Sequence, residues 1–160
     1  MALSKADILA KYPLPVYNYK VDISDGSSTS TVAFSEVSGL NMPYETSTYK
    51  ESKTSEPGSG PNIMYMIAQP QPVNITLKKG YVKANSINVL YAWLNTKQLN
   101  GLDKRDISVK LCDENGNPIV TWKVLNAFPT KLDAPTFDAS SNDVAIESME
   151  LMADWVTLEE

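Results

Sequence analysis

The sequence predicts a mainly β fold: a β-barrel-like sandwich of about seven strands with one flanking α-helix and one long loop. Apolar and polar residues alternate with a period of two in several short segments, as in strands that are buried on one face. One segment has the apolar spacing of an amphipathic helix instead, and the dipeptide Asn115-Gly116 is typical of a tight β-hairpin. A chain of 160 residues normally forms one domain, and we expect residues 1–160 to do so.

The alternation begins at residues 16–23, where one face of the predicted strand carries aromatic and β-branched residues. A turn is expected at residues 24–28, because the Asp and Gly within it favour turn geometry. A second strand is expected over residues 31–40, interrupted by Gly39.

Residues 41–62 are the least regular part of the chain. Their second half is polar and rich in Gly, Pro and Ser, which predicts an exposed, extended loop. Residues 63–67 are apolar, and two prolines follow shortly after them. Because proline cannot donate to a β-ladder, this pattern predicts an edge or bulged segment. Residues 74–78 alternate again and predict a short strand with Ile75 and Leu77 on its inward face.

One helix is predicted between residues 85 and 101. Either Asn85 or Ser86 can cap its N-terminus. Lys97 would complement the dipole at its C-terminus, and Gly101 lies just past the expected end. The apolar stripe, which Trp93 widens, consists of Ile87, Leu90, Tyr91 and Leu94.

The last third of the chain predicts a hairpin and a final strand. Residues 107–112 and 120–124 alternate on either side of the turn at 113–118. Burying the three apolar side chains of the return strand contributes about 1.5–3 kcal/mol each. A last strand is expected over residues 143–156, with apolar residues on both of its faces.

The composition excludes several classes of function. The chain has no His and one Cys, which removes Ser-His-Asp and Cys-His catalysis and any intrachain disulfide. Its net charge of −5 argues against specific nucleic-acid binding. No segment has the roughly 18 apolar residues of a membrane span, and residues 1–11 lack the apolar stretch of a secretory signal. We therefore expect cytoplasmic synthesis without a signal peptide, and no membrane binding by the free subunit.

Three motif matches are better explained by structure than by chemistry. Residues 113–117 begin like an EF-hand loop, but the required Gly and Glu do not follow. Residues 47–50 match the Ser-x-x-Lys nucleophile motif without its partner motifs. Glu147 and Glu150 point to opposite faces of a strand, so we expect them to face solvent or an interface rather than flank a glycosidic bond. We predict no catalytic, cofactor-binding or metal-binding residue, and no enzyme.

Several segments, in this order and spacing, carry a family resemblance. They are YPLPVY at 12–17, FSEVSGL at 34–40, NITLKKG at 74–80, KRDI at 104–107, DENGNPIVTW at 113–122, NAFPTK at 126–131 and NDVAIESMEL at 142–151. Together they resemble the tail tube proteins of contractile phages and of phage-tail-like contractile injection systems. The resemblance extends over about residues 12–157.

The resemblance implies a structural protomer. Such subunits form hexameric rings that stack into a rigid hollow tube inside a contractile sheath, and their fold is shared with the haemolysin-coregulated protein of type VI secretion. The implied partners are other copies of the chain, the sheath protein, baseplate and terminator proteins, and cargo in the lumen. The implied location is a phage tail or phage-tail-like particle.

Within this single tail-tube domain, we expect residues 1–11 to be an N-terminal arm and residues 41–62 to be an extended inter-subunit loop. Unpaired strand edges and apolar side chains on two faces are a hazard in a monomer, and neighbouring subunits would cover them. The residues expected to anchor the subunit interface are Tyr44, Tyr49, Met64, Tyr65 and Met66.

Two other interpretations stay open at the level of sequence. A monomeric ligand-binding β-barrel would use its Trp and Tyr side chains to line a cavity, and it requires a closed barrel. A tube-initiating or adaptor subunit at the baseplate would share the fold of the main tube protein. The sequence alone also does not separate a phage from a cell-encoded injection system.

Overall fold

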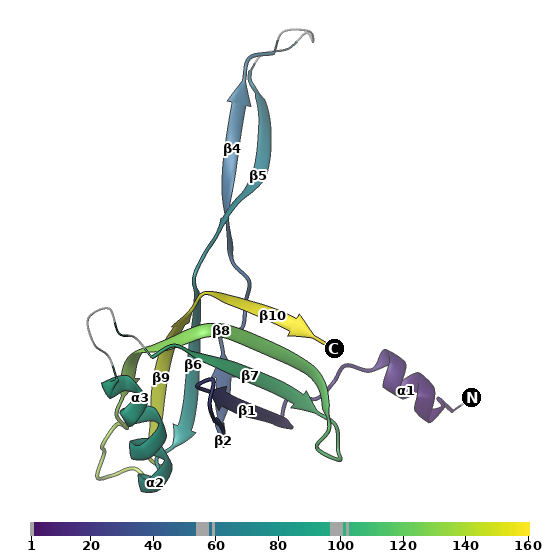
Figure 1. The fold of residues 1–160 in the computed structure, drawn as a ribbon. Helices are drawn as coiled ribbons and strands as arrows, with labels where there is room; N and C mark the ends of the chain where they lie inside the picture. The colour runs from purple at the N-terminus through teal and green to yellow at the C-terminus, as the bar shows by residue number, and fades with distance from the viewer. Residues whose placement is uncertain (1, 54–57, 59, 97–100, 102) are drawn as a thin grey trace.

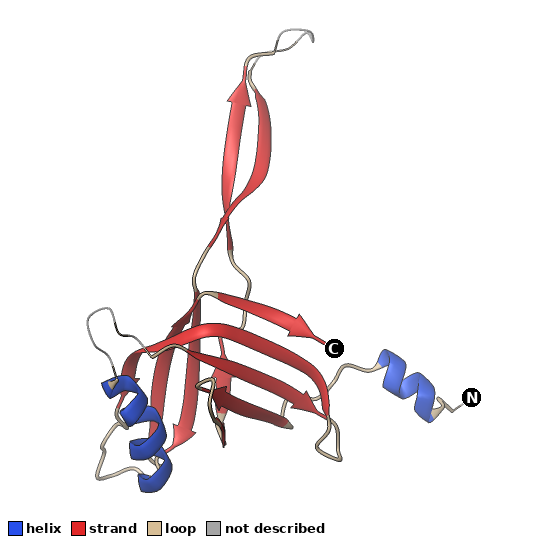
Figure 2. Cartoon of the chain, in the orientation of Figure 1, coloured by secondary structure: helices blue, strands red, loops and turns tan. Residues whose placement is uncertain are grey.

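The computed structural model describes residues 2–53, 58, 60–96, 101 and 103–160. It contains a curled antiparallel sheet, a two-stranded ribbon that projects far from this sheet, and a short N-terminal helix held apart from both (Figure 1). Strands dominate the chain, as Figure 2 shows by colour. The predicted mainly β class is confirmed.

The curled sheet joins eight strands in the order β2-β1-β7-β8-β9-β6-β3, with β10 paired to β8. Every pairing in it is antiparallel. The strands are β1 (Tyr19–Ser24), β2 (Thr29–Val32), β3 (Glu36–Ser38), β6 (Val73–Gly80), β7 (Arg105–Cys112), β8 (Pro118–Asp133), β9 (Ile146–Ala153) and β10 (Trp155–Glu159). The sheet does not close, so the predicted barrel-like sandwich is an open, curled one.

The long strand β8 links the two halves of the sheet. Its first part pairs with β7 and β10, and its last part pairs with β9. Between these parts Asn126 has a positive φ of 54° and marks a bend. Its backbone N–H donates to the Asp106 carboxylate at 3.0 Å, and its side-chain amide donates to Asp154 at 2.8 Å. Side chains of β7 and of the turn between β9 and β10 therefore hold the bend in place.

The core lies inside the curl and is built from alternating strand residues. In β6 the buried residues are Val73, Ile75 and Leu77, and in β1 they are Val21 and Ile23. The predicted inward faces of both strands, and of the hairpin strand β7, are confirmed. Alternation was a good guide here because these strands have one buried face each.

The helix that covers one end of the sheet is a single helical run of three parts: α2 (Lys83–Asn85), the π-helical turn η1 (Ser86–Tyr91) and α3 (Ala92–Asn95). It begins before Asn85 and Ser86, so the prediction that one of them precedes the helix as its cap was wrong. The side chains of residues 85–88 lie outside the described part of the structure, as does Lys97.

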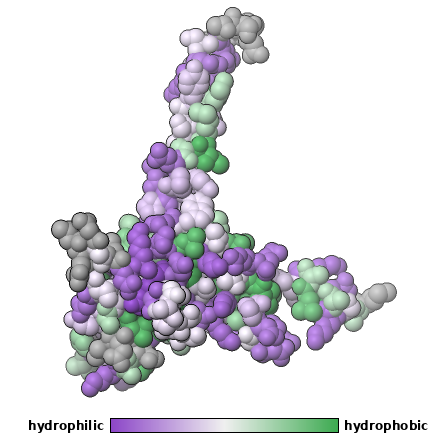
Figure 3. Space-filling view, in the orientation of Figure 1, coloured by the Kyte–Doolittle hydropathy of each residue, from purple (hydrophilic) through white to green (hydrophobic). Residues whose placement is uncertain are grey.

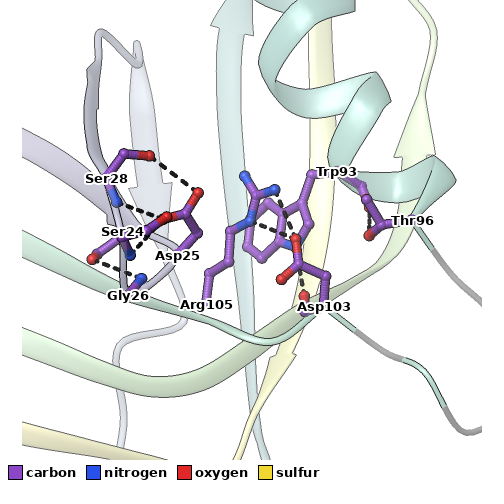
Figure 4. Close-up of polar contacts among 9 residues, drawn as sticks. Ser24, Asp25, Gly26, Ser28, Trp93, Thr96, Asp103 and Arg105 are labelled. Carbon is purple, nitrogen blue, oxygen red and sulfur yellow. Dashed lines mark hydrogen bonds and ion pairs between the residues drawn. The ribbon is translucent and has the colours of Figure 1, made fainter.

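Trp93 fixes this helix to the sheet. It is fully buried, and its indole N–H donates to the carbonyl of Asp103 at 2.8 Å. Arg105, at the start of β7, stacks 5.0 Å from the Trp93 ring and donates to the Asp103 carboxylate at 2.8 and 3.0 Å (Figure 4). Trp93 therefore serves the core and does not line a ligand cavity.

Three other predictions need correction. The arm 1–11 contains a second helix, α1 (Lys5–Lys11), because Ser4 caps it by accepting from the Asp7 N–H at 3.1 Å. The strand expected at 31–40 is two strands, β2 and β3. The strand expected at 143–156 is also two, β9 and β10, because the chain turns at Asp154, whose N–H donates to Leu125 at 3.1 Å.

Gly39 is required by a close backbone approach. Its φ is +87°, and a Cβ at this position would lie 2.2 Å from the carbonyl oxygen of Asn74 on β6. Gly26 has nearly the same φ, +88°, with nothing within 4 Å of a Cβ there. The two glycines therefore differ in crowding but hardly in φ.

We predict that Gly39→Ala lowers the free energy of unfolding much more than Gly26→Ala. The positive φ alone costs about 1–2 kcal/mol in each variant, and Gly39→Ala must also displace backbone, for a total of at least about 3 kcal/mol. Chemical denaturation of the two variants measures the difference. Equal losses would show that the approach to Asn74 is unimportant.

Candidate assembly surface

The projecting ribbon consists of β4 (Tyr44–Glu51) and β5 (Asn62–Pro70), which pair with each other and with no other described strand. The segment 41–62, which the sequence predicts to be an extended loop, contains the strand β4 at residues 44–51, and its other described residues before Asn62 lie outside strands.

The register of the ribbon assigns its side chains to two faces, since directly paired residues lie on the same side. The first face holds the pairs Ser47–Met66, Tyr49–Met64 and Glu51–Asn62. The second face holds the pairs Thr46–Ile67, Thr48–Tyr65 and Lys50–Ile63. Both faces thus carry large apolar side chains.

No residue of the ribbon is buried in the free chain. Tyr65 is 78% exposed and Ile67 is 75% exposed, and both lie on the second face. Figure 3 shows apolar side chains along the ribbon among polar ones. An apolar surface of this kind on a protruding element typically marks a protein–protein interface.

The base of the ribbon is attached to the body by an aromatic contact. The Tyr44 ring meets the Trp155 ring of β10 edge to face, with centroids 5.2 Å apart. Below it, the Gln71 N–H donates to the carbonyl of Pro43 at 2.9 Å. Near the base the ribbon has a bulge, where the register shifts between Tyr44 and Thr46.

The structure does not bring the five predicted interface residues into one patch. Tyr49, Met64 and Met66 share the first face, Tyr65 lies on the second, and Tyr44 lies at the base. The prediction omitted Ile63 and Ile67, which flank Tyr65 on the second face. In residues 63–67 every side chain is apolar or aromatic, so a strand at this position would place such side chains on both of its faces. This pattern could have predicted a two-faced ribbon.

Two carboxylates with lowered pKa values lie in turns rather than in a cleft. The backbone N–H groups of Ser28 and Ser27 donate to Asp25 at 2.7 and 2.9 Å, and they hold the pKa of that carboxyl below its usual range (Figure 4). The backbone N–H of Asn117 donates to Asp113 at 2.8 Å and lowers its pKa in the same way. The turn predicted at 113–118 is confirmed, and these carboxylates stabilise turns.

The strand carboxylates Glu147 and Glu150 point to opposite faces, as predicted, but one environment differs from the expectation. Glu150 is exposed, with its carboxylate 3.8 Å from Lys131. Glu147 is buried on the core side of β9, 4.0 Å from the ammonium group of Lys79, which is also buried. Burial of Glu147 corrects the prediction that it faces solvent or an interface. Glu147 can be buried because its cross-strand partner on β6, Lys79, carries the opposite charge.

These features define a class of protein: a β-structured chain with an exposed ribbon that carries apolar side chains on both faces. The chain belongs to the family described as T4-like virus tail tube protein gp19, whose model matches residues 15–157. The suspected tail tube family is confirmed. Within the described residues, no helix has the length and apolar character required to span a membrane.

Solved structures of contractile particles contain similar chains. A chain of an extracellular contractile injection system, the PVC sheath-tube complex in its extended state, is 38% identical over 99% of both chains, with a TM-score of 0.84. A chain of the anti-feeding prophage cap is 39% identical over 99% of both chains, with a TM-score of 0.81. A baseplate chain of the same prophage is 16% identical over 93% of this chain and 97% of that one, with a TM-score of 0.74, and shares the fold. No curated protein matches.

We predict that Lys79→Met lowers the free energy of unfolding by about 3–5 kcal/mol, because it removes the buried ammonium group that lies 4.0 Å from the buried Glu147 carboxylate. The matched control is Lys78→Met, the next residue on β6, which removes an exposed pair with Glu36 at 3.2 Å. This control is expected to cost about 0–1 kcal/mol. Denaturant unfolding measures both, and equal losses would contradict the role of the buried pair.

Proposed function

We propose that this chain is the protomer of the rigid inner tube of a contractile injection system or phage tail. Six copies form a ring, rings stack into a hollow conduit, and contraction of a surrounding sheath drives the conduit forward. Membership of the tail tube family carries this proposal. Similarity to a chain of the PVC sheath-tube complex, at 38% identity over 99% of both chains, supports it.

The ribbon supplies contacts between copies in this proposal. Its two apolar faces need two covering surfaces, and two neighbouring subunits can provide them. Tyr49, Met64 and Met66 anchor the first face, and Ile63, Tyr65 and Ile67 anchor the second. Tyr44 supports the interface indirectly, by holding the base of the ribbon against Trp155.

The subunit is synthesised in the cytoplasm and assembles into a particle with sheath, baseplate and terminator proteins. It has no enzymatic activity, binds neither membranes nor specific nucleic-acid sequences, and passes its cargo through the lumen. Its negative net charge fits a lumen that does not retain nucleic acid.

A subunit at the end of the tube is the second candidate. Similarity to a chain of the anti-feeding prophage cap is as high as that to the sheath-tube chain, at 39% and 38% identity. A monomeric ligand-binding barrel is disfavoured, because it requires a closed barrel and the sheet is open.

Electron microscopy of the purified protein tests the proposed function. We expect six-fold rings and tubes of uniform width, with tube length rising with protein concentration. Rings that never stack would favour the terminal subunit. A monomer at every concentration would overturn both proposals.

Substitutions on each face of the ribbon test its role. We predict that Tyr65→Ser and Tyr49→Ser each raise the concentration needed for tube formation about tenfold or more, because aromatic anchors dominate protein interfaces. The thermal unfolding of the free subunit should hardly change, since both side chains are exposed. Sedimentation of tubes gives the critical concentration, with Thr48→Ser as the control on the second face. If only one variant impairs assembly, the second covering surface does not exist.

A further inference from the structure

The core of the curled sheet is uncovered at one end. Along the inner face of β1, burial falls from Ile23 and Val21, which are buried, to Tyr19, which is half-buried. Along β7 it falls in the same way from Ile107 and Val109 to Leu111. The register places Tyr19 directly opposite Leu111. These residues therefore form a last core layer that the described part of the chain covers only in part.

This uncovered layer forms an apolar groove of about 400 Å³. Tyr19, Leu111 and Trp122 line it from β1, β7 and β8, and Val37 and Leu40 line it from β3 and the segment that follows. The Tyr19 hydroxyl donates to the Phe34 carbonyl at 2.6 Å, so the polar atom of this side chain is satisfied within the chain. The groove therefore requires an apolar occupant.

The helix α1 has the complementary property: it is apolar on one side, and that side is exposed. None of its residues is buried, and Figure 1 shows it lying apart from the sheet. Ile8 and Leu9 share a face with Tyr12, one turn further on, and Leu9 is 71% exposed. The polar side carries the Asp7–Lys11 ion pair at 3.7 Å. A helix this short needs packing of its apolar side to be stable.

The link between α1 and β1 directs the helix away from its own groove. It contains Pro13 and Pro15, which fix φ and force the preceding residues into extended backbone. Tyr12 is extended accordingly, with φ −88° and ψ 140°. Val16 already lines the groove, so the linker starts at the groove's edge and carries the helix outward by about 3.1 Å per residue.

We infer that α1 of one subunit packs into the Tyr19–Leu111–Trp122 groove of a second copy of the chain. Ile8, Leu9 and Tyr12 supply the apolar contact, and the proline linker sets the distance between the two bodies. This inference rests on the proposed self-assembly, which gives each groove a neighbour that can fill it. The arm is thus a second inter-subunit connection, separate from the ribbon.

Cross-linking of two full-length variants, each with one introduced cysteine, tests the inference. One carries Leu9→Cys on the helix, and the other, which bears a larger tag, carries Leu40→Cys at the groove. The native Cys112 is buried, and the unsubstituted protein controls for its reactivity. After mixing under assembly conditions and treatment with a short bismaleimide, we expect a heterodimer band on a denaturing gel. Val37→Cys is a second groove variant if Leu40→Cys fails to fold.

Matched controls separate docking from random collision. Ala10→Cys lies on the other side of α1, and Val144→Cys is exposed on the loop between β8 and β9. Pairing Ala10→Cys with Leu40→Cys, or Leu9→Cys with Val144→Cys, should give several-fold less heterodimer. Equal yields would overturn the inference. A chain with both Leu9→Cys and Leu40→Cys that bridges only within itself would also overturn it, because the arm would then fill its own groove.

Microscopy of the same samples separates this inference from the proposed function. Tubes without the specific cross-link would overturn the inference alone. The specific cross-link in samples that never form rings or tubes would support docking of the arm but overturn the tube proposal.

Discussion

The apolar side chains of the ribbon need to be covered, and the free chain leaves them exposed. Two paired strands satisfy each other's inner backbone hydrogen bonds, but an isolated pair has no third element to bury its side chains. The ribbon nevertheless carries large apolar residues on both faces. Its conformation is held at the base by the Tyr44–Trp155 contact, and in the proposed tube neighbouring subunits would cover the rest.

The body of the subunit shows the same incompleteness in another form. The bend at Asn126 lets β8 belong to both halves of the sheet, which curls the sheet enough to enclose a core without closing it. One layer of that core, at Tyr19 and Leu111, is left half-covered. An open end costs stability in a monomer, and in the proposed assembly it offers an apolar surface to a neighbouring subunit.

Sequence patterns predicted the parts of the fold in which one face is buried. The alternation in β1, β6 and β7 placed Val21, Ile75 and Val109 inward, because burial on one side imposes a period of two. The ribbon strand β4 escaped prediction because neither of its faces is buried, so hydrophobic patterning carries no signal there. Helix α1 is signalled only by its Ser4 cap. Whether Tyr44 contacts Trp155 depends on distant pairing that a local pattern cannot encode.

The ribbon also explains how such a surface can avoid indiscriminate association. Both strands have an outer edge without a partner strand among the described residues, and free edges are templates for aggregation. Lys50 and Glu51 place charges toward the outer end of β4, and Pro70 ends β5 without a backbone donor. These residues disfavour the addition of another strand, whereas the faces between them stay apolar. The net charge of −5 adds a weak general repulsion between copies. Association is therefore favoured only where side-chain faces match, which is the selectivity that an ordered tube requires.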